Sequence, residues 1–245
     1  MATAEFRTIR PGIETLGCSF SLPRHRHLRA YALVVLAGTV EESGYAGRIR
    51  ATAGDVLVHP ALDCHENRRV SAGVRLIRLY WPEEAPVERG LFRLEDVDAV
   101  ARAAERDVGE AGWLLRAALR ERRAASPGRR DDWPDLLAAA LAEDADTAIG
   151  AWAEAHGLAA ETASRGFAAA YGVTPVAFRA EQRTRAAWLR VTRGDEPLSA
   201  IAADTGFADQ AHMTRWMRRM TGAPPAAWRR AAQPEARRGR RVRTQ

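Results

Sequence analysis

The stretch LSAIAADTGFADQAHMTRWMRRMTGAPPAAWRR, residues 198–230, contains the helix that decides how this chain folds and what it contacts. At about 100° per residue, one side of residues 210–220 is an apolar stripe, which consists of Met213, Trp216, Met217 and Met220. Arg215 and Arg218 fall on the opposite side. Asp209 is expected to cap the start of this helix and Gly222 to end it. The pattern predicts a helix that packs by its methionines and presents its arginines.

A second copy of this pattern lies 50 residues upstream. FAAAYGVTPVAFR (167–179) aligns with MRRMTGAPPAAWR (217–229) as apolar-x-x-x-x-Gly-x-x-Pro-x-x-aromatic-Arg. Each copy follows a short helix, TAIGAWAEAHG or LSAIAADTG, which predicts two helix–turn–helix units. Between them, Thr174 and Pro175 open a helix that would act as a rigid spacer. Two outward helices on one spacer could enter successive major grooves, about 34 Å apart.

Charge is distributed unevenly along the 245 residues. Residues 1–146 carry 21 Arg against 23 Asp and Glu, whereas residues 147–245 carry 16 Arg against 8 acids. The first part therefore has a net charge of 21 − 23 = −2 and the second of 16 − 8 = +8. This asymmetry predicts that only the second part meets a polyanion.

With these motifs in place, residues 132–230 resemble the DNA-binding domain of the AraC/XylS family of bacterial transcription regulators. The first copy departs from the family pattern at Ala163 and Gly166, where leucines are usual. The resemblance implies a sequence-specific regulator that binds double-stranded DNA, with RNA polymerase as a further partner. The expected DNA-binding residues are Gln210, Ala211, His212, Thr214, Arg215, Arg218 and Arg219 in the second copy and Glu161, Ser164 and Arg165 in the first. Arg215 is the expected base reader, because arginine can bind guanine O6 and N7 together.

Short Val-, Leu- and Ile-rich runs in residues 20–80 predict an antiparallel barrel or sandwich. HRHLRAYALVVLAG and GDVLVHPALDCHEN resemble the two motifs of the cupin barrel. His25, His27 and His65 are therefore candidate ligands for zinc or another divalent transition metal. Tyr31 stands where cupins usually have a glutamate, and His59 and Cys64 are weaker candidates. Alternatively, the histidines bond around a pocket for a small organic ligand or cap strand ends.

The expected architecture is an α+β multidomain chain. It comprises a cupin-like antiparallel β-barrel sensor at 1–82, a helical linker at 83–131 that could form a homodimer, tandem helix–turn–helix motifs at 132–233, and a basic disordered tail at 234–245. Within the linker, residues 94–125 are expected to form one or two helices and residues 126–134 a hinge. The longest apolar run is too short to span a membrane, no secretion signal is evident, and two cysteines make no disulfide framework, so we expect a cytoplasmic protein without a membrane partner.

The predicted function is transcription regulation in response to an unknown small molecule or metal, without catalysis. One alternative is a metal-dependent cupin enzyme with an accessory DNA-binding domain. A nucleoid-type binder, which would contact phosphates without reading sequence, is another.

Overall fold

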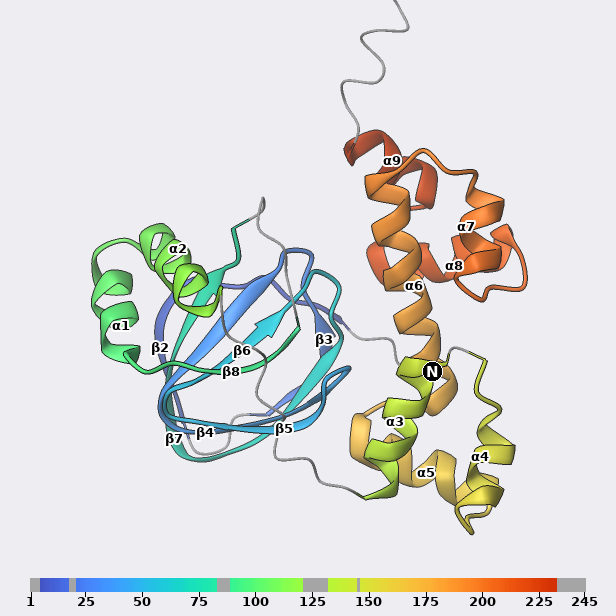
Figure 1. Ribbon diagram of the computed structural model, residues 1–245, viewed down its shortest axis with the longest axis horizontal. Coiled ribbons are helices and arrows are strands. Elements are labelled where there is room, and N and C mark those ends of the chain that lie inside the picture. Colours follow the sequence, from blue (N-terminus) through green and yellow to red (C-terminus); the bar gives the residue numbers. More distant parts are fainter. Residues whose placement is uncertain (1–4, 18–20, 83–88, 121–131, 145, 233–245) are drawn as a thin grey trace, which may run out of the picture.

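The computed structural model describes residues 5–17, 21–82, 89–120, 132–144 and 146–232. They form a domain built on a curved sheet, followed by a domain made of helices, and the two lie against each other (Figure 1). The predicted tail at 234–245 and most of the predicted hinge at 126–134 fall outside these residues. In the described part of the chain, no helix is long and apolar enough to cross a membrane.

The first domain, here called the sheet domain, contains one eight-stranded sheet. Its strands are β1 (Glu5–Phe6), β2 (Gly12–Leu16), β3 (Leu22–Arg26), β4 (Tyr31–Gly44), β5 (Gly47–Thr52), β6 (Asp55–His59), β7 (His65–Tyr80) and β8 (Gly90–Arg93). The hydrogen-bonded order is β1-β3-β7-β4-β6-β8, with β2 on β7 and β5 on β4. The sheet is mixed rather than purely antiparallel, because β1 pairs with β3 in parallel. The sheet is also not closed by hydrogen bonds, since β1 and β8 end this order.

Alternation along the strands separates two apolar cores. On β4, Ala32 and Val34 pack on one face, whereas Tyr31, Leu33 and Val35 pack on the other. This follows from the period of two in a strand, which sends successive side chains to opposite faces. Both faces of the sheet are therefore buried, one under helices and one inside its own curve.

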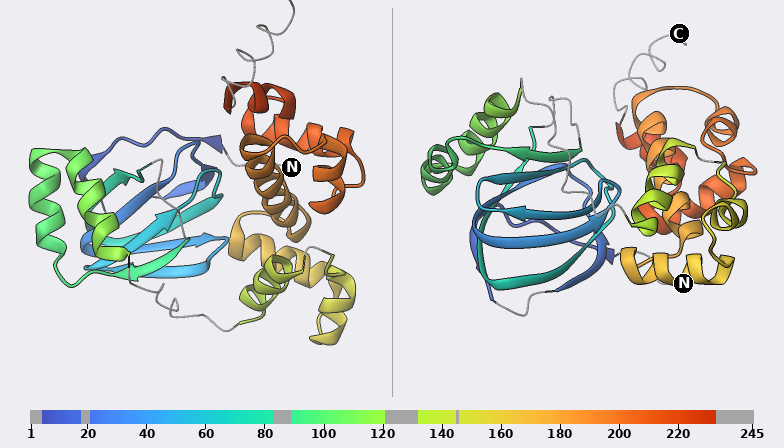
Figure 2. Two further views of the ribbon diagram at one scale, coloured as in Figure 1. Left: turned by 45° about the horizontal axis from the view of Figure 1, so that its top comes forward. Right: turned by 60° about the horizontal axis from the view of Figure 1, so that its bottom comes forward.

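Helices α1 (Val97–Arg106) and α2 (Val108–Leu119) cover the outer face, as Figures 1 and 2 show. Asp96 and Asp107 cap their first turns by accepting from backbone N–H groups. These are the helices expected within 94–125. Strand β8, however, lies inside the segment expected to be a helical linker and pairs with β6. That expectation was wrong at 90–93, because a four-residue strand has too little periodicity to be recognised.

The helical domain comprises α3 (Trp133–Glu143), α4 (Ile149–Ala155), α5 (Ala160–Tyr171), α6 (Pro175–Arg193), α7 (Leu198–Asp204), α8 (Gln210–Thr221) and α9 (Pro225–Ala232). Helix α6 is the predicted spacer, and the Thr174 side chain accepts from the backbone N–H of Ala177 at its start. At 1.5 Å per residue its 19 residues extend about 28 Å. One apolar core lies around α3, α5 and the start of α6, and another around the end of α6, α7 and α8.

Candidate nucleic-acid interface and histidine cluster

Helix α8 is held by the capping groups that the sequence indicates. The Asp209 side chain accepts from the backbone N–H of His212 at 2.5 Å, and Gly222 ends the helix with φ 77°. A positive φ suits glycine, which has no Cβ to clash with the backbone. Met213, Met217 and Met220 are fully buried, whereas Trp216 is half-buried at the edge of the stripe. The apolar side of the helix therefore packs as predicted.

The opposite side of α8 is open to solvent at most predicted positions. Exposed side chains there are Gln210, Ala211, Arg215, Arg218 and Arg219, and Thr214 is half-buried. His212 is also half-buried, and its Nε2 accepts from the Trp216 indole N–H at 3.1 Å. Its ring also meets Phe207 edge-on, with centroids 5.4 Å apart. His212 is thus engaged within the domain, while Arg215 projects outward.

In α5, the matching positions Glu161 and Arg165 are exposed and Ser164 is half-buried. The departures from the family pattern have a packing reason. Ala163 is fully buried, and a Cβ added to Gly166 would overlap the Trp133 ring of α3. Gly166 therefore makes room for Trp133, while the full burial of Ala163 leaves no space for a larger side chain.

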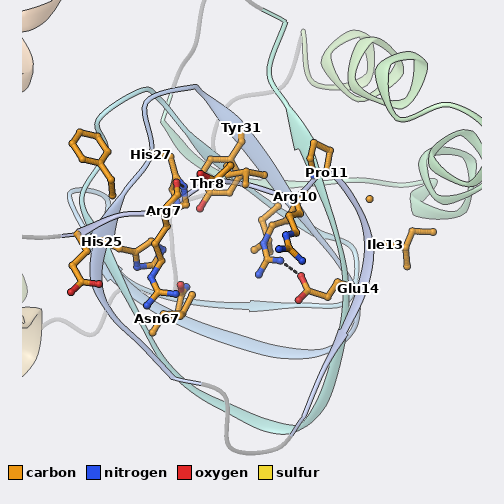
Figure 3. Close-up of a pocket in the computed structure, with 17 residues that line it drawn as sticks. Arg7, Thr8, Arg10, Pro11, Ile13, Glu14, His25, His27, Tyr31 and Asn67 are labelled. Atoms are coloured by element: carbon orange, nitrogen blue, oxygen red, sulfur yellow. Dashed lines mark hydrogen bonds and ion pairs between the residues drawn. The ribbon is translucent and has the colours of Figure 1, made fainter. Parts of the chain in front are cut away.

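A cavity of about 690 Å³ opens into the sheet domain between the β1–β2 segment and the inner face of the sheet. Figure 3 shows His25, His27, Tyr31 and Asn67 around it, with Arg7 on the segment that runs across it. The other lining residues include Arg10, Glu14 and Arg78, of which the last two form an ion pair. The lining therefore combines apolar surface with several cationic groups.

The three predicted metal-ligand histidines meet beside this cavity. Their ring centroids are 4.3 Å apart for His25 and His65, 5.1 Å for His25 and His27, and 5.6 Å for His27 and His65. One ring nitrogen from each lies within 4.8 Å of the others. The predicted convergence of these side chains is therefore present in the structure.

Hydrogen bonds orient each imidazole of this group. Nδ1 of His25 lies 2.9 Å from the Pro23 carbonyl and Nδ1 of His27 lies 2.6 Å from that of Arg7. For His65, Nδ1 lies 3.3 Å from the Asp63 carbonyl, and Nε2 is 3.0 Å from the Tyr31 hydroxyl. A carbonyl can only accept, so Nδ1 carries the proton and Nε2 keeps its lone pair.

Burial keeps these rings neutral. It lowers the pKa of His25 to about 4 and that of His27 to about 3, and it lowers the pKa of His65 well below its usual value. Neighbouring imidazoles contribute to the lower pKa of His27 and His65. Neutral imidazole is the form that ligates a metal, so the group fits a divalent transition ion.

Two further buried residues belong to the neighbourhood. Glu42 on β4 and His59 at the end of β6 have ligand atoms within 4.8 Å of each other and of His65. Burial raises the pKa of Glu42 to about 7, whereas its neighbour His59 acts to lower it. Burial alone would lower the pKa of His59, but the carboxylates of Glu42 and Asp63 outweigh this effect and raise it.

The structure brings His59, which the sequence offers only as a weaker candidate, next to Glu42, which the sequence does not indicate. No short motif marks Glu42, because only the pairing of β4 with β6 and β7 brings it near His59 and His65. Cys64, in contrast, lies in the apolar core shared with α3 and α5, away from the histidines.

Strand β3 faces both this cluster and the helical domain. His25 and His27 point inward, while Arg24 and Arg26, which alternate with them along the chain, point outward, as the period of two in extended backbone requires. Arg24 donates to Glu181 of α6, with distances of 2.7 and 3.0 Å, and to the Tyr171 carbonyl at 3.1 Å. Tyr171 is the last residue of α5.

Arg26 makes the corresponding contact with α8. Its Nε donates to the Met220 carbonyl at 2.5 Å and its Nη2 to the Arg219 carbonyl at 3.2 Å. The last carbonyls of a helix lack partners within it and carry the negative end of its dipole. One strand thus supplies cations to the carboxyl ends of both α5 and α8.

Further contacts join the domains around this strand. The Tyr45 hydroxyl donates to Glu181 at 3.3 Å, and Arg185 of α6 donates to the Ala61 carbonyl at 2.9 Å. Arg48 forms ion pairs with Asp132 and Asp135 at the start of α3. These polar contacts are distributed over the sheet side of the helical domain, beside the apolar core that Tyr45 and Cys64 share with α3 and α5.

Comparisons with known proteins identify the helical domain. Residues 152–231 match the family model of a helix-turn-helix domain. The DNA-binding domain of the global transcriptional factor AdpA, solved with a target DNA, is 24% identical, with 44% of this chain and 98% of that chain covered and a TM-score of 0.39. The C-terminal domain of the response regulator YesN from Fusobacterium nucleatum is 18% identical over 38% of this chain and 94% of that chain, with a TM-score of 0.36.

ToxT from Vibrio cholerae with a bound unsaturated fatty acid is 9% identical, with 89% of this chain and 94% of that chain covered and a TM-score of 0.40. Comparison with curated proteins gives no significant match. The structural scores are low, so the family match carries the identification. Residues 152–231 therefore form a helix–turn–helix domain, which covers less than half of the chain.

Proposed function

We propose that α4–α5 and α7–α8 act as two helix–turn–helix units that place α5 and α8 in successive major grooves of one duplex. The exposed polar face of α8, with Arg215 projecting from it, carries this proposal. Arg215 reads a guanine, Gln210 and Thr214 support it, and Arg218 and Arg219 contact phosphates. In α5, Glu161, Ser164 and Arg165 take the corresponding places.

The cavity of the sheet domain is the proposed effector site. Arg7 and Arg10 line the cavity against one further acid, Glu5, since Arg78 is paired with Glu14, and this excess of positive charge on a partly apolar lining favours an anionic organic molecule. The Nε2 atoms of His25, His27 and His65 offer a divalent transition metal three neutral ligands beside the same cavity. Either ligand would contact β3 from its inner side.

Strand β3 is the proposed connection between effector and DNA. A ligand that moves His25 or His27 also moves Arg24 or Arg26, because these residues alternate along one short backbone segment. Those arginines hold the carboxyl ends of α5 and α8, so their displacement changes the relative placement of the two helices. Ligand binding would then shift the population between arrangements with different affinity for DNA.

Two partner proposals follow from the predicted linker. Helix α2 leaves Trp113 50% and Leu114 39% exposed on the side away from the sheet, which supports a homodimer through α1 and α2. Contact with RNA polymerase stays a prediction. The alternative of a metal-dependent enzyme draws on the same histidine cluster and requires turnover of a cavity-bound substrate.

Selection of random duplex DNA by the full chain tests the DNA-reading proposal. The expected result is a two-part motif with centres about 10–10.5 base pairs apart. Arg215→Ala should remove base preference in one half of the motif, whereas Arg230→Ala, exposed on α9, should leave it intact. Enrichment of no motif by the wild type would favour sequence-blind binding instead.

The connection through β3 needs a separate test, a change on the cavity side of this segment. His27→Ala should change the affinity for the selected duplex in the wild-type background, and most of that change should be lost in an Arg26→Met background. If Arg26→Met keeps the same fold-change in affinity, β3 is not the connection.

A further inference from the structure

Glu42, His59 and His65 come from three neighbouring strands, in the order β7-β4-β6. All three are buried: the Glu42 side chain is 5% exposed, that of His59 3% and that of His65 1%. Glu42 Oε2 lies 3.6 Å from His59 Nε2 and 4.0 Å from His65 Nε2. Three polar side chains therefore face one another in the interior without direct hydrogen bonds between them.

The distances from Glu42 Oε2 to the two histidine Nε2 atoms are close to those between ligand atoms that coordinate one metal ion. Ligands of a tetrahedral zinc, with bonds of about 2.0–2.2 Å, lie roughly 3.3–3.6 Å apart. The two Glu42 distances need a contraction of only a few tenths of an ångström, and the ligand atoms of His59 and His65 lie within 4.8 Å of each other. Two imidazoles and one carboxylate are also a donor set that zinc and iron(II) accept.

His59 has the surroundings of a metal-ligating histidine. Its Nδ1 lies 3.3 Å from Asp63 Oδ2, and Asp63 Oδ1 in turn pairs with Arg89 at 2.8 Å. Its Nε2 is buried and has no hydrogen-bond partner in the described part of the chain. A carboxylate on one ring nitrogen orients the imidazole and makes the other nitrogen a better ligand. An imidazolium at His59 would leave Nε2–H without an acceptor within hydrogen-bond distance.

Charge also favours a cation at this position. Glu42 and Asp63 are two buried carboxylates on either side of His59, and Arg89 pairs with Asp63 on the far side. Glu42 accepts a hydrogen bond from Asn67 Nδ2 at 3.1 Å, but the amide carries no charge. Among the described residues, its ion-pair partners are His59 and His65, which balance its charge only when protonated. A divalent ion would supply that balance.

We propose that Glu42, His59 and His65 form a binding site for a divalent transition metal, with Asp63 orienting His59. This site is distinct from the group of His25, His27 and His65, and does not depend on the DNA-binding proposal. His65 belongs to both, and its Nδ1 is held by the Asp63 carbonyl. The His65 Nε2 atom can therefore ligate an ion in only one of the two groups at a time. Glu42 gives the second group a negative charge that the first lacks, so the ion is held by Glu42, His59 and His65. The Tyr31 hydroxyl, 3.0 Å from His65 Nε2, gives up that contact when the ion binds.

The experiment is a Co²⁺ titration of the metal-stripped full chain, followed by visible absorption and by metal content after gel filtration. The wild type should retain one Co²⁺ per chain. Glu42→Gln and His59→Gln should each weaken binding by more than about 100-fold, and Asp63→Asn by about 10–100-fold, the range for a residue that orients a ligand. His25→Gln and His27→Gln should bind within a few-fold of the wild type, and the exposed His156→Gln is a surface control.

X-ray absorption of the zinc-loaded wild type gives a readout that needs no variant. Two imidazoles and one carboxylate oxygen are expected, and three imidazoles would overturn the proposal. It would also be overturned if His25→Gln and His27→Gln lost the metal while Glu42→Gln kept it, or if the wild type bound no ion. Circular dichroism and binding to the selected duplex show that each variant is folded, and loss of DNA binding alone would leave the metal result standing.

Discussion

The buried ion pair between Arg24 and Glu181 gives the sharpest prediction about how the domains hold together. Its side chains are 5% and 2% exposed, and the guanidinium donates at 2.7 and 3.0 Å to one carboxylate oxygen. Arg24→Met would leave Glu181 buried with the Tyr45 hydroxyl, 3.3 Å away, as its remaining donor among the described residues, and would remove the donor to the Tyr171 carbonyl. Removing one partner of a buried pair costs about 3–5 kcal/mol, because the other charge stays desolvated.

The double variant Arg24→Met/Glu181→Met separates this effect from lost packing. With both charges gone, the pair is replaced by apolar groups of similar volume, and the expected cost falls to about 2 kcal/mol for the lost bonds to the Tyr171 carbonyl and from the Tyr45 hydroxyl. The two single variants should therefore be far from additive. A buried pair that merely filled space would give additive costs.

Cys64 provides the assay. It lies in the apolar core shared by the two domains, and burial raises the pKa of its thiol to about 12, so it should react slowly with iodoacetamide. In a Cys18→Ser background, a loss of 3–5 kcal/mol confined to the interface should speed alkylation about 10²–10³-fold or more, at about 1.4 kcal/mol per factor of ten. Urea unfolding of the same variants measures the whole chain. An Arg24→Met variant that loses less than about 1 kcal/mol and is alkylated at the wild-type rate would refute the reasoning.

Three further predictions concern single residues. Arg215→Ala should lower discrimination between the selected duplex and unrelated DNA by about 1–3 kcal/mol while the salt-dependent background remains, and Arg230→Ala should lower none; unchanged discrimination in Arg215→Ala would remove Arg215 from the base readers. Gly166→Ala should lower the melting temperature although alanine favours a helix by about 1 kcal/mol, because the added methyl overlaps Trp133; a higher melting temperature would contradict this packing. Leu62→Gly should unfold at a lower urea concentration. Glycine relieves the backbone strain of a φ of 59°, worth about 1 kcal/mol, but the chain loses the roughly 2–5 kcal/mol contributed by a fully buried leucine side chain. Unfolding at a higher urea concentration would show that the backbone strain is the larger of the two.

The helices α6 and α8 and their capping residues could be predicted from the sequence, because the patterns that indicate them lie within a few neighbouring residues. Asp209, Thr174 and Gly222 act within four residues of their own positions, and the methionine stripe of α8 follows from helical periodicity alone. What the pattern did not reveal was why Gly166 is small. That reason lies in Trp133, more than thirty residues away, and depends on how α3 packs on α5.

The histidine cluster was predictable only in part, for the same reason. His25 and His27 share a face because they are two residues apart, at the end of β3 and just after it, and a sequence can show this spacing. Glu42 and His59 join His65 through the pairing of three strands, whose register is set by the whole sheet. The parallel pairing of β1 with β3 and the short strand β8 likewise depend on contacts between segments distant in sequence.

Strand β3 presents histidines to the cavity and arginines to the helical domain, and this depends on its register against β7. Contacts with the helical domain help to set that register. His25 pairs with His65 of β7, but the register shifts between Leu22 and His25, so few ladder positions specify it. A slip by one residue would exchange the two faces, placing arginines in the cavity and histidines against the helices. The buried bonds of Arg24 to Glu181 and of Arg26 to Met220 oppose such a slip. The contacts with α6 and α8 therefore keep His25 and His27 facing the cavity, and by reciprocity any ligand of those histidines acts on the same contacts.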